Sequence, residues 1–163
     1  MMECKIMTIG VYGSSERAFF KTLTNAGIDT FCDIRARRGV RGSEYAFVNS
    51  KRLQARLAEM GIRYIHRRDL APSKALRIQQ SEHDRAERIK KRDRLGLSPG
   101  FVTDYREECL TDFDSQAFLD SLGQEAQVIV FFCVEREAAA CHRSLLTERL
   151  SQDLGLSVEH IVI

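Results

Sequence analysis

Gln127-Val-Ile-Val-Phe-Phe-Cys133 reads as the strongest strand in the chain. Its apolar residues leave no polar face, so we expect a strand that is buried on both sides, at the centre of a sheet. Downstream, the segment from Glu137 to Leu154 carries leucines at helical spacing and ends at Gly155. A last apolar run, from Val158 to Ile163, predicts another strand. Strand, helix and strand in this order favour parallel pairing with a right-handed crossover.

The N-terminal part of the chain shows the same alternation. Short apolar runs at 6–9, 30–34 and 62–66 predict strands, and the segments between them predict helices near 14–27 and 49–61. Residues 35–47 hold four arginines and two glycines without a clear period, which predicts a loop. The first half therefore indicates a parallel sheet as well.

Residues from about 70 to 122 interrupt this rhythm and predict a helical insertion. Residues 74–95 form a charged segment with a thin apolar side, and Ser98-Pro99 is typical of a helix start. A further helix is expected at 115–122. A charged helix usually presents a solvated face. We expect the insertion to cover the site edge of the sheet, or to form a contact between copies of the chain.

These elements predict one domain, residues 1–163, with an α/β fold. We expect a three-layer sandwich around a five-stranded, mostly parallel sheet with strand order 3-2-1-4-5. This order places the carboxyl ends of the first, second and fourth strands together.

Composition fits a cytoplasmic globular protein. The chain has 163 residues, of which 44% are hydrophobic and 29% charged, and a net charge of +2, too small to identify a nucleic-acid binder by itself. Residues 1–10 lack the features of a signal peptide, and no apolar run approaches the roughly 20 residues of a membrane span. The five scattered cysteines are expected to be reduced thiols.

Reactive residue types gather at the predicted strand ends, where open parallel sheets bind ligands. They are Gly10 and Tyr12 after the first strand, Asp33 and Arg35 after the second, His66 and Arg68 after the third, and Cys133 and Glu135 after the fourth. Cys141, His142 and Arg143 lie near the start of the following helix. This convergence predicts one site.

Each of these residues has a chemical and a structural interpretation. A cysteine near a helix N-terminus and an arginine favours the thiolate form, although Cys133 and Cys141 are equally suited to burial as small apolar side chains. His142 suits acid–base work or a structural hydrogen bond. The positive charge of Arg143 near a helix N-terminus is unfavourable, because that end of the helix dipole is also positive. An anion bound there, or an ion pair with Glu135 or Glu137, would remove this repulsion. We predict catalytic roles for Cys133, Glu135, Cys141 and His142.

We predict that a second set of residues contacts the ligand. Two of its members, Asp33 and Arg35, can instead form a structural ion pair. Aromatic side chains at Tyr12, Tyr45 and Phe47 are candidates for stacking on a base. The full set of expected ligand-binding residues is Gly10, Tyr12, Asp33, Arg35, His66 and Arg143.

We expect no metal and no cofactor. Adjacent residues on a helix point about 100° apart, so Cys141 and His142 are not expected to share one ion with Cys133, and no fourth ligand is evident. Cys133 and Arg143 are too far apart for the phosphatase pattern of cysteine, five residues and arginine. Gly10 to Gly13 is too short for a glycine-rich phosphate loop.

Cys133-Val-Glu135 followed by Cys141-His142-Arg143-Ser144-Leu145-Leu146 resembles the signature of the domain-of-unknown-function 488 family. Four further segments resemble blocks of that family: Thr8-Ile9-Gly10, Asp33-Ile34-Arg35, Gly61 to His66, and Leu70-Ala71-Pro72-Ser73. The resemblance spans essentially the whole chain and implies a compact α/β fold with a shared site and no settled activity. Residues 36–41 depart from it, because the family commonly has proline and serine there.

A weaker resemblance is to rhodanese-type sulfurtransferases, which share the Asp-x-Arg strand end and a strand ending in cysteine before a helix. Here the loop after Cys133 is longer and lacks the expected glycine.

Three hypotheses for function follow. The first is binding or processing of an anionic, phosphate-bearing ligand, either a nucleotide or a nucleic acid, with Arg35 and Arg143 holding the anion and Glu135 and His142 exchanging protons. The second is thiol chemistry with Cys133 as the nucleophile and Cys141 as its partner. The third is a non-catalytic module that binds nucleic acid or protein. It would use the arginine-containing loop at residues 35–47 and the charged helical segment at residues 74–95.

Overall fold

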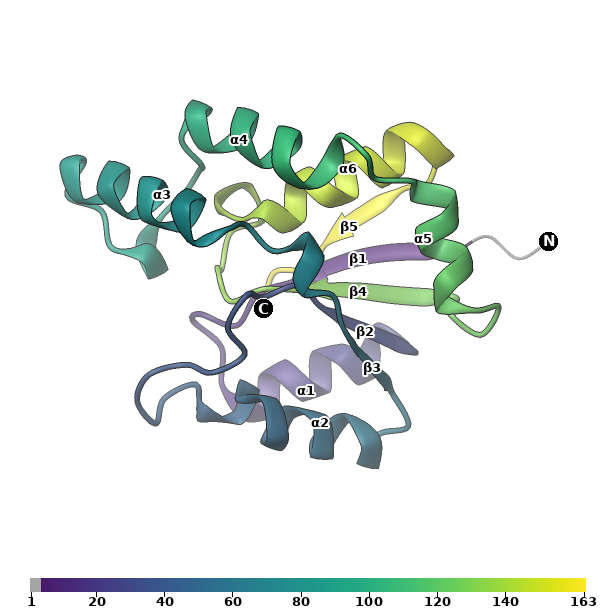
Figure 1. Cartoon of the computed structure of the whole chain (residues 1–163). Helices are drawn as coiled ribbons and strands as arrows, with labels where there is room; N and C mark the ends of the chain where they lie inside the picture. Colours follow the sequence, from purple (N-terminus) through teal and green to yellow (C-terminus); the bar gives the residue numbers. More distant parts are fainter. Residues whose placement is uncertain (1–3) are drawn as a thin grey trace.

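Five parallel strands form a single sheet in the computed structural model, which describes residues 4–163 (Figure 1). The strands are β1 (Lys5–Ile9), β2 (Thr30–Asp33), β3 (Arg63–His66), β4 (Val128–Phe132) and β5 (Val158–His160). Every strand pair is parallel. The predicted α/β class and the five-stranded sheet are therefore confirmed.

The predicted strand order, 3-2-1-4-5, is wrong, since the sheet runs β3-β2-β4-β1-β5. β4 lies between β1 and β2, with Phe132 in register with both Ile9 and Asp33. This central position suits an all-apolar strand, because neighbouring strands cover both edges of β4 and helices cover both of its faces. β5 is short and largely exposed, as an edge strand can be. The ends of β1, β2 and β4 still lie side by side.

Helices cover the two faces of the sheet unequally. α1 (Glu16–Asn25) and α2 (Ser50–Glu59) lie on one face, and α3 (Lys74–Ala86), α4 (Pro99–Tyr105), α5 (Ser115–Leu122) and α6 (His142–Leu154) lie toward the other (Figure 1). The chain reverses its direction across the sheet after β3, so right-handed crossovers place the later helices opposite the earlier ones. Alternate residues of β4 accordingly enter two separate cores, Val130 and Phe132 in one and Ile129 and Phe131 in the other.

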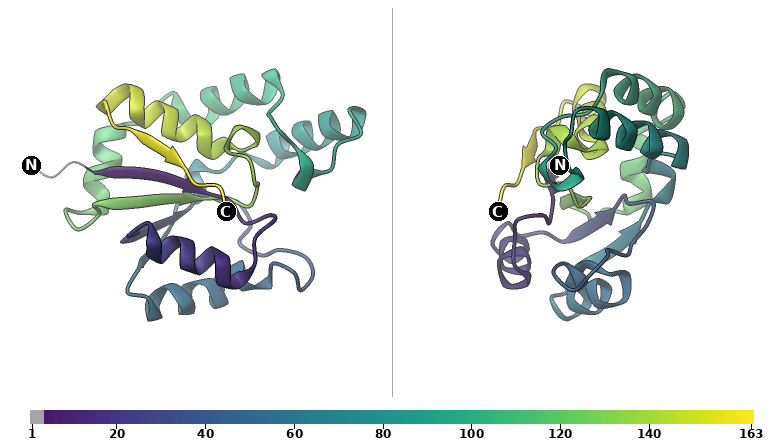
Figure 2. Two further views of the ribbon diagram at one scale, coloured as in Figure 1. Left: turned by 180° about the vertical axis from the view of Figure 1, so that it is seen from behind. Right: turned by 90° about the vertical axis from the view of Figure 1, so that its left-hand side faces the viewer.

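The region between β3 and β4, which we expected to be a helical insertion and call the insertion below, contains α3, α4 and α5. Its charged segment is not one helix over 74–95, because α3 ends at Ala86 and Arg88 takes a positive φ of 57°. The chain then turns back to Ser98, whose side chain accepts a hydrogen bond from Phe101 N at 3.2 Å and caps α4 as predicted. α3 and the following turn extend beyond the carboxyl ends of the strands (Figure 2).

Within residues 4–163 no helix has both the length and the apolar character that crossing a bilayer requires. All five cysteines are free thiols.

Candidate functional site

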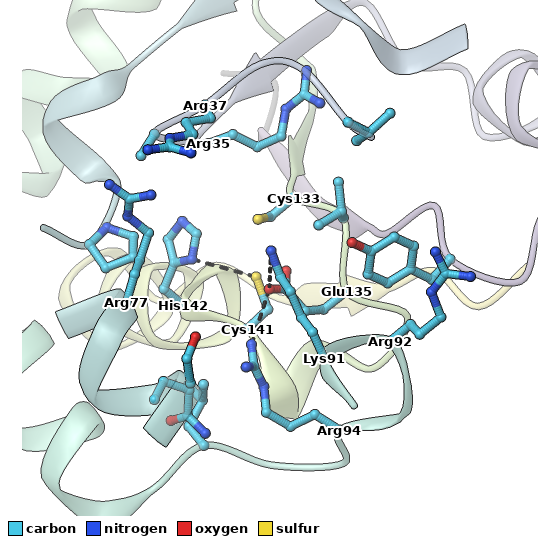
Figure 3. A pocket seen from close by; sticks show the side chains of 18 of the residues that line it. Arg35, Arg37, Arg77, Lys91, Arg92, Arg94, Cys133, Glu135, Cys141 and His142 are labelled. Carbon is cyan, nitrogen blue, oxygen red and sulfur yellow. Dashed lines mark hydrogen bonds and ion pairs between the residues drawn. The ribbon is translucent and has the colours of Figure 1, made fainter. Parts of the chain in front are cut away.

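A cavity of about 670 Å³ lies at the carboxyl ends of β1, β2 and β4 (Figure 3). Its walls come from the loops that follow these strands and from residues 77–97 of the insertion. β1 and β2 connect to helices on one face, while β4 connects to α6 on the other. The connections that leave neighbouring strands therefore run to opposite faces of the sheet. Such a position is a topological switch point, where open α/β sheets bind their ligands.

The lining of this cavity is strongly cationic. Of the described residues that line it, Glu135 is the one acidic side chain. Eight lining residues are basic: Arg35, Arg37, Arg41, Arg77, Lys90, Lys91, Arg92 and Arg94. Arg35, Arg37 and Arg77 approach from one side, and Lys91, Arg92 and Arg94 from the other (Figure 3). Like charges around a low-dielectric cleft focus the potential and concentrate anions there.

Asp33, the last residue of β2, holds Arg35 in place. Arg35 donates from Nε to Asp33 Oδ1 at 2.9 Å and from Nη2 to Oδ2 at 2.8 Å, and both side chains are buried. Tyr64 also donates to Asp33 Oδ2, at 2.7 Å. Arg35 Nη1 is buried without a hydrogen-bond partner among the residues of the structure. Asp33 is thus a positioning residue, and Arg35 presents an unpaired donor in the wall of the cavity.

The side chains of Cys141 and His142 lie close together at the N-terminus of α6. Cys141 is the N-cap of the helix, and its Sγ accepts from Arg143 N at 3.5 Å. His142 Nε2 lies 2.8 Å from the carbonyl of Ile34, and since a carbonyl only accepts, Nε2 carries the proton. His142 Nδ1 is then the free nitrogen, and it lies 3.6 Å from Cys141 Sγ.

The expectation that Cys141 and His142 point apart is therefore wrong. The 100° spacing applies within a helix, but the N-cap lies outside the helix and has extended backbone angles, φ −139° and ψ 146°. Cys133 completes the group, and the ligand atoms of the three residues all lie within 4.8 Å of one another.

Cys133 is poorly suited to act as a thiolate nucleophile. Its hydrogen bond with Cys141 and its burial raise the pKa of the Cys133 thiol well above the ordinary value. Thiol chemistry of the rhodanese type requires a thiolate at this strand end. The environment of Cys133 does not favour that interpretation.

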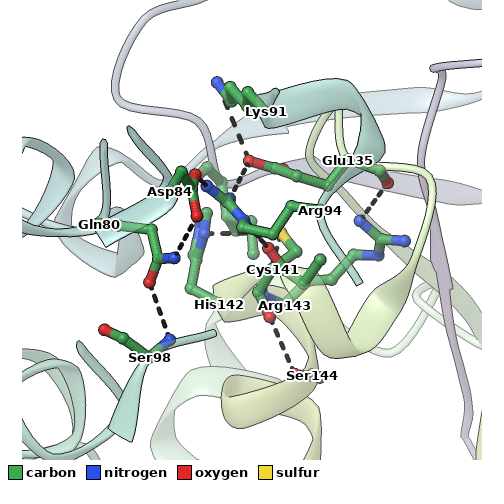
Figure 4. Close-up of polar contacts among 12 residues, drawn as sticks. Gln80, Asp84, Lys91, Arg94, Ser98, Glu135, Cys141, His142, Arg143 and Ser144 are labelled. Atoms are coloured by element: carbon green, nitrogen blue, oxygen red, sulfur yellow. Dashed lines mark hydrogen bonds and ion pairs between the residues drawn. The ribbon is translucent and has the colours of Figure 1, made fainter. Parts of the chain in front are cut away.

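Glu135 belongs to a buried network that ties the insertion to the loop after β4 (Figure 4). Arg94 donates from Nη2 to Glu135 Oε1 at 3.0 Å and from Nη1 to Asp84 Oδ2 at 2.8 Å. Gln80 donates to Asp84 Oδ1 at 2.8 Å and accepts from Ser98 N at 3.0 Å. Burial alone raises the pKa of Glu135, but the charges of Lys91 and Arg94 outweigh it and lower that pKa to about 2. Glu135 is thus a permanent carboxylate and not a proton donor near neutral pH.

Six of the predicted site residues line the cavity: Tyr12, Arg35, Cys133, Glu135, Cys141 and His142. Arg143 is directed elsewhere, since its Nη1 donates to the carbonyl of Glu135 at 2.7 Å and its Nη2 to that of Arg136 at 3.2 Å. His66 Nε2 bonds the carbonyl of Arg35 at 2.8 Å. These two residues hold the loops around the cavity and do not face it.

Gly10 also shapes a loop. A Cβ at this position would lie 1.9 Å from the carbonyl oxygen of Glu135, so only glycine allows the two strand ends to approach this closely.

Replacing Gly10 by alanine is expected to lower the free energy of unfolding by about 1 to 3 kcal/mol, because the Glu135 carbonyl must move away from Arg143 to admit the methyl group. Urea denaturation measures the loss. Gly96→Ala is the matched control, because nothing lies within 4 Å of its added Cβ. Equal unfolding midpoints for the two variants would contradict the close approach.

Sequence reasoning expected the insertion to cover the site edge or to form a contact between copies, but it named none of the insertion's side chains as site residues. Arg77, Lys91, Arg92 and Arg94 come from the segment expected to be solvated. Arg92 places its guanidinium 5.5 Å from the ring centroid of Tyr12 and 5.7 Å from that of Tyr45, two rings whose centroids are 5.3 Å apart. Both tyrosines line the cavity, but Tyr12 is the partly exposed one, since Tyr45, like Phe47, is buried in the core.

A family model described as "Domain of unknown function DUF488" matches residues 15–150. The match includes β2, β4, the insertion and the Cys-His-Arg segment. Comparison with curated proteins and with solved structures yields no match.

Proposed function

This chain belongs to the DUF488 family, whose description names no activity, and from the cavity we propose that it binds a phosphate-bearing anion of nucleotide size. The observation that carries this proposal is the lining of eight basic side chains against one carboxylate. That carboxylate is already engaged, because Arg94 and Lys91 lie 3.0 and 3.8 Å from Glu135 Oε1. Four of the eight basic residues form no ion pair within residues 4–163, so their charge is left for a ligand: Arg37, Arg41, Arg77 and Lys90.

Arginines are the majority of these cations, and a guanidinium matches the paired oxygens of a phosphate group. Arg35 contributes Nη1, which is buried and has no acceptor within residues 4–163. A buried donor without a partner costs free energy, and an anion in the cavity removes that cost.

The cavity also offers a surface for a base. Its volume falls within the range of about 300 to 1,000 Å³ that holds small ligands and cofactors. Tyr12 lies partly exposed in its wall, packed against the buried ring of Tyr45, and aromatic faces stack on nucleobases. A mononucleotide satisfies both the cationic and the aromatic part of the lining.

Isothermal titration calorimetry with inorganic phosphate, adenosine 5′-monophosphate, adenosine and a short single-stranded oligonucleotide tests the proposal. We expect the mononucleotide to bind at least about tenfold more tightly than adenosine, since one charge-assisted hydrogen bond exceeds the 1.4 kcal/mol that a factor of ten requires. Arg77→Gln is expected to weaken mononucleotide binding by at least about tenfold for the same reason.

Arg56→Gln is the matched control, because Arg56 lies on α2, pairs with exposed Glu59 and does not line the cavity. Tighter binding of the oligonucleotide with a steep salt dependence would identify the ligand as nucleic acid. Equal affinities for adenosine and the mononucleotide, or no binding of any probe at millimolar concentration, would overturn the proposal.

A further inference from the structure

Two thiols and an imidazole nitrogen lie close together in the lining of the cavity. Cys133 Sγ, Cys141 Sγ and a ring nitrogen of His142 all lie within 4.8 Å of one another. Cys141 Sγ and His142 Nδ1 lie 3.6 Å apart. For a tetrahedral zinc ion, bond lengths of about 2.3 Å to sulfur and 2.0–2.1 Å to nitrogen place these two atoms about 3.5 Å apart. The pair already has the spacing of two ligands to one ion.

The surroundings of the imidazole match those of a metal ligand. A ligating histidine donates its other ring N–H to a carbonyl or carboxylate, which fixes the ring and the tautomer. His142 does this through Nε2 to the carbonyl of Ile34, at 2.8 Å, so Nδ1 is the ring nitrogen that is directed toward Cys141 Sγ. The backbone N–H of Arg143 supports Cys141 Sγ from the other side, at 3.5 Å.

Charge balance is also favourable, despite the cationic lining. Two thiolates neutralise a divalent ion, so the ion adds no net positive charge to the site. A coordinating thiol loses its proton to the solvent when the ion binds, so the raised pKa of the Cys133 thiol in the metal-free protein does not prevent coordination.

We propose that Cys133, Cys141 and His142 Nδ1 bind a divalent transition metal of the zinc type. Sulfur and nitrogen donors select zinc and its neighbours over magnesium or calcium, which prefer oxygen. Three protein ligands leave one position of a tetrahedral ion, and all three residues line the cavity, so that position is filled from the cavity. This inference is independent of the anion proposal, since it requires none of the cavity arginines.

Cobalt and zinc titrations of the reduced, metal-free protein in phosphate-free buffer test the site. We expect one equivalent of Co²⁺ to produce the sulfur-to-cobalt charge-transfer absorption and the intense visible bands of a tetrahedral thiolate site, and one equivalent of Zn²⁺ to abolish both. Cys133→Ser, Cys141→Ser and His142→Gln are each expected to weaken Co²⁺ binding by more than about 100-fold, beyond the loss seen on removing an outer-shell partner. Cys109→Ser is the control, because Cys109 is free and lies outside the cluster.

A second measurement uses the unaltered chain and so does not depend on the folding of variants. One equivalent of Zn²⁺ is expected to slow alkylation of Cys133 and Cys141 at least tenfold, read by peptide mass spectrometry, while alkylation of Cys4 and Cys109 is unchanged. Absence of the charge-transfer band together with unchanged alkylation would overturn the proposal, as would a folded Cys133→Ser variant that binds as tightly as the parent. Neither result would alter the nucleotide titration, so the two proposals fail separately.

Discussion

Replacing Arg94 by methionine is expected to lower the free energy of unfolding by about 3 to 5 kcal/mol. Arg94 is 9% exposed and neutralises two carboxylates, Asp84 and Glu135, which are 8% and 7% exposed. Without the guanidinium, both remain as buried charges, with Lys91 at 3.8 Å from Glu135 as the nearest replacement. Denaturation in urea, followed by far-ultraviolet circular dichroism, measures the loss.

Arg106→Met is the matched control for this prediction. Arg106 also donates to a glutamate, Glu148, at 3.0 Å, but the two side chains are 52% and 49% exposed. An exposed ion pair contributes less than about 1 kcal/mol. Combining Arg94→Met with Asp84→Asn and Glu135→Gln is expected to restore part of the lost stability, because the buried charges are then gone. Similar losses for Arg94→Met and Arg106→Met would show that the buried network does not have the role assigned to it.

Replacing Asp33 by alanine is expected to destabilise the fold by a similar amount, about 3 to 5 kcal/mol. Arg35 would lose both side-chain hydrogen bonds to Asp33 and retain the one from Nη2 to the carbonyl of Val48, and the hydroxyl of Tyr64 would lose its acceptor. Calorimetric melting measures the change in stability. Nucleotide affinity, measured on the fraction that folds, is expected to fall as well because Arg35 is no longer oriented.

The chain offers a close control in Asp69→Ala. Arg67 and Asp69 are also two residues apart and also form a two-pronged pair, with distances of 2.9 and 2.8 Å, but Asp69 is 61% exposed. Its removal is expected to cost less than about 1 kcal/mol. If Asp33→Ala and Asp69→Ala melt at the same temperature, burial does not set the strength of the Asp33–Arg35 pair.

Local patterns in the sequence predicted the elements and the class of the fold. The run from Val128 to Phe132 was correctly interpreted as a central strand because it has no polar face. The same pattern does not say which strands are its neighbours. That choice depends on the direction of each crossover, and the insertion after β3 brings the chain back across β2 to the gap beside β1.

The candidate site was predictable to the extent that it consists of strand ends. Tyr12, Arg35 and Cys133 were placed at one edge because parallel strands all end on the same side of a sheet. Arg94 was missed, since its burial depends on Asp84 and Glu135, to which no local spacing points. The contact between Cys141 and His142 was missed because the helix was expected to begin at Glu137, whereas α6 begins at His142 and leaves Cys141 as its N-cap.

The position of β4 has a consequence for the order in which the molecule is assembled during synthesis. β1 and β2 do not pair with each other, and β4 is the strand that pairs with both of them, so Lys5 cannot pair with Val128 until residue 128 has been synthesised. A nascent chain that has emerged only as far as β3 holds the β2–β3 pair with the inner edge of β2 unpaired, and it holds β1 apart from that pair. Unpaired strand edges are where chains associate wrongly. We therefore expect β4 to connect β1 with the β2–β3 pair only after most of the chain has been synthesised, and the cavity to form in the same step.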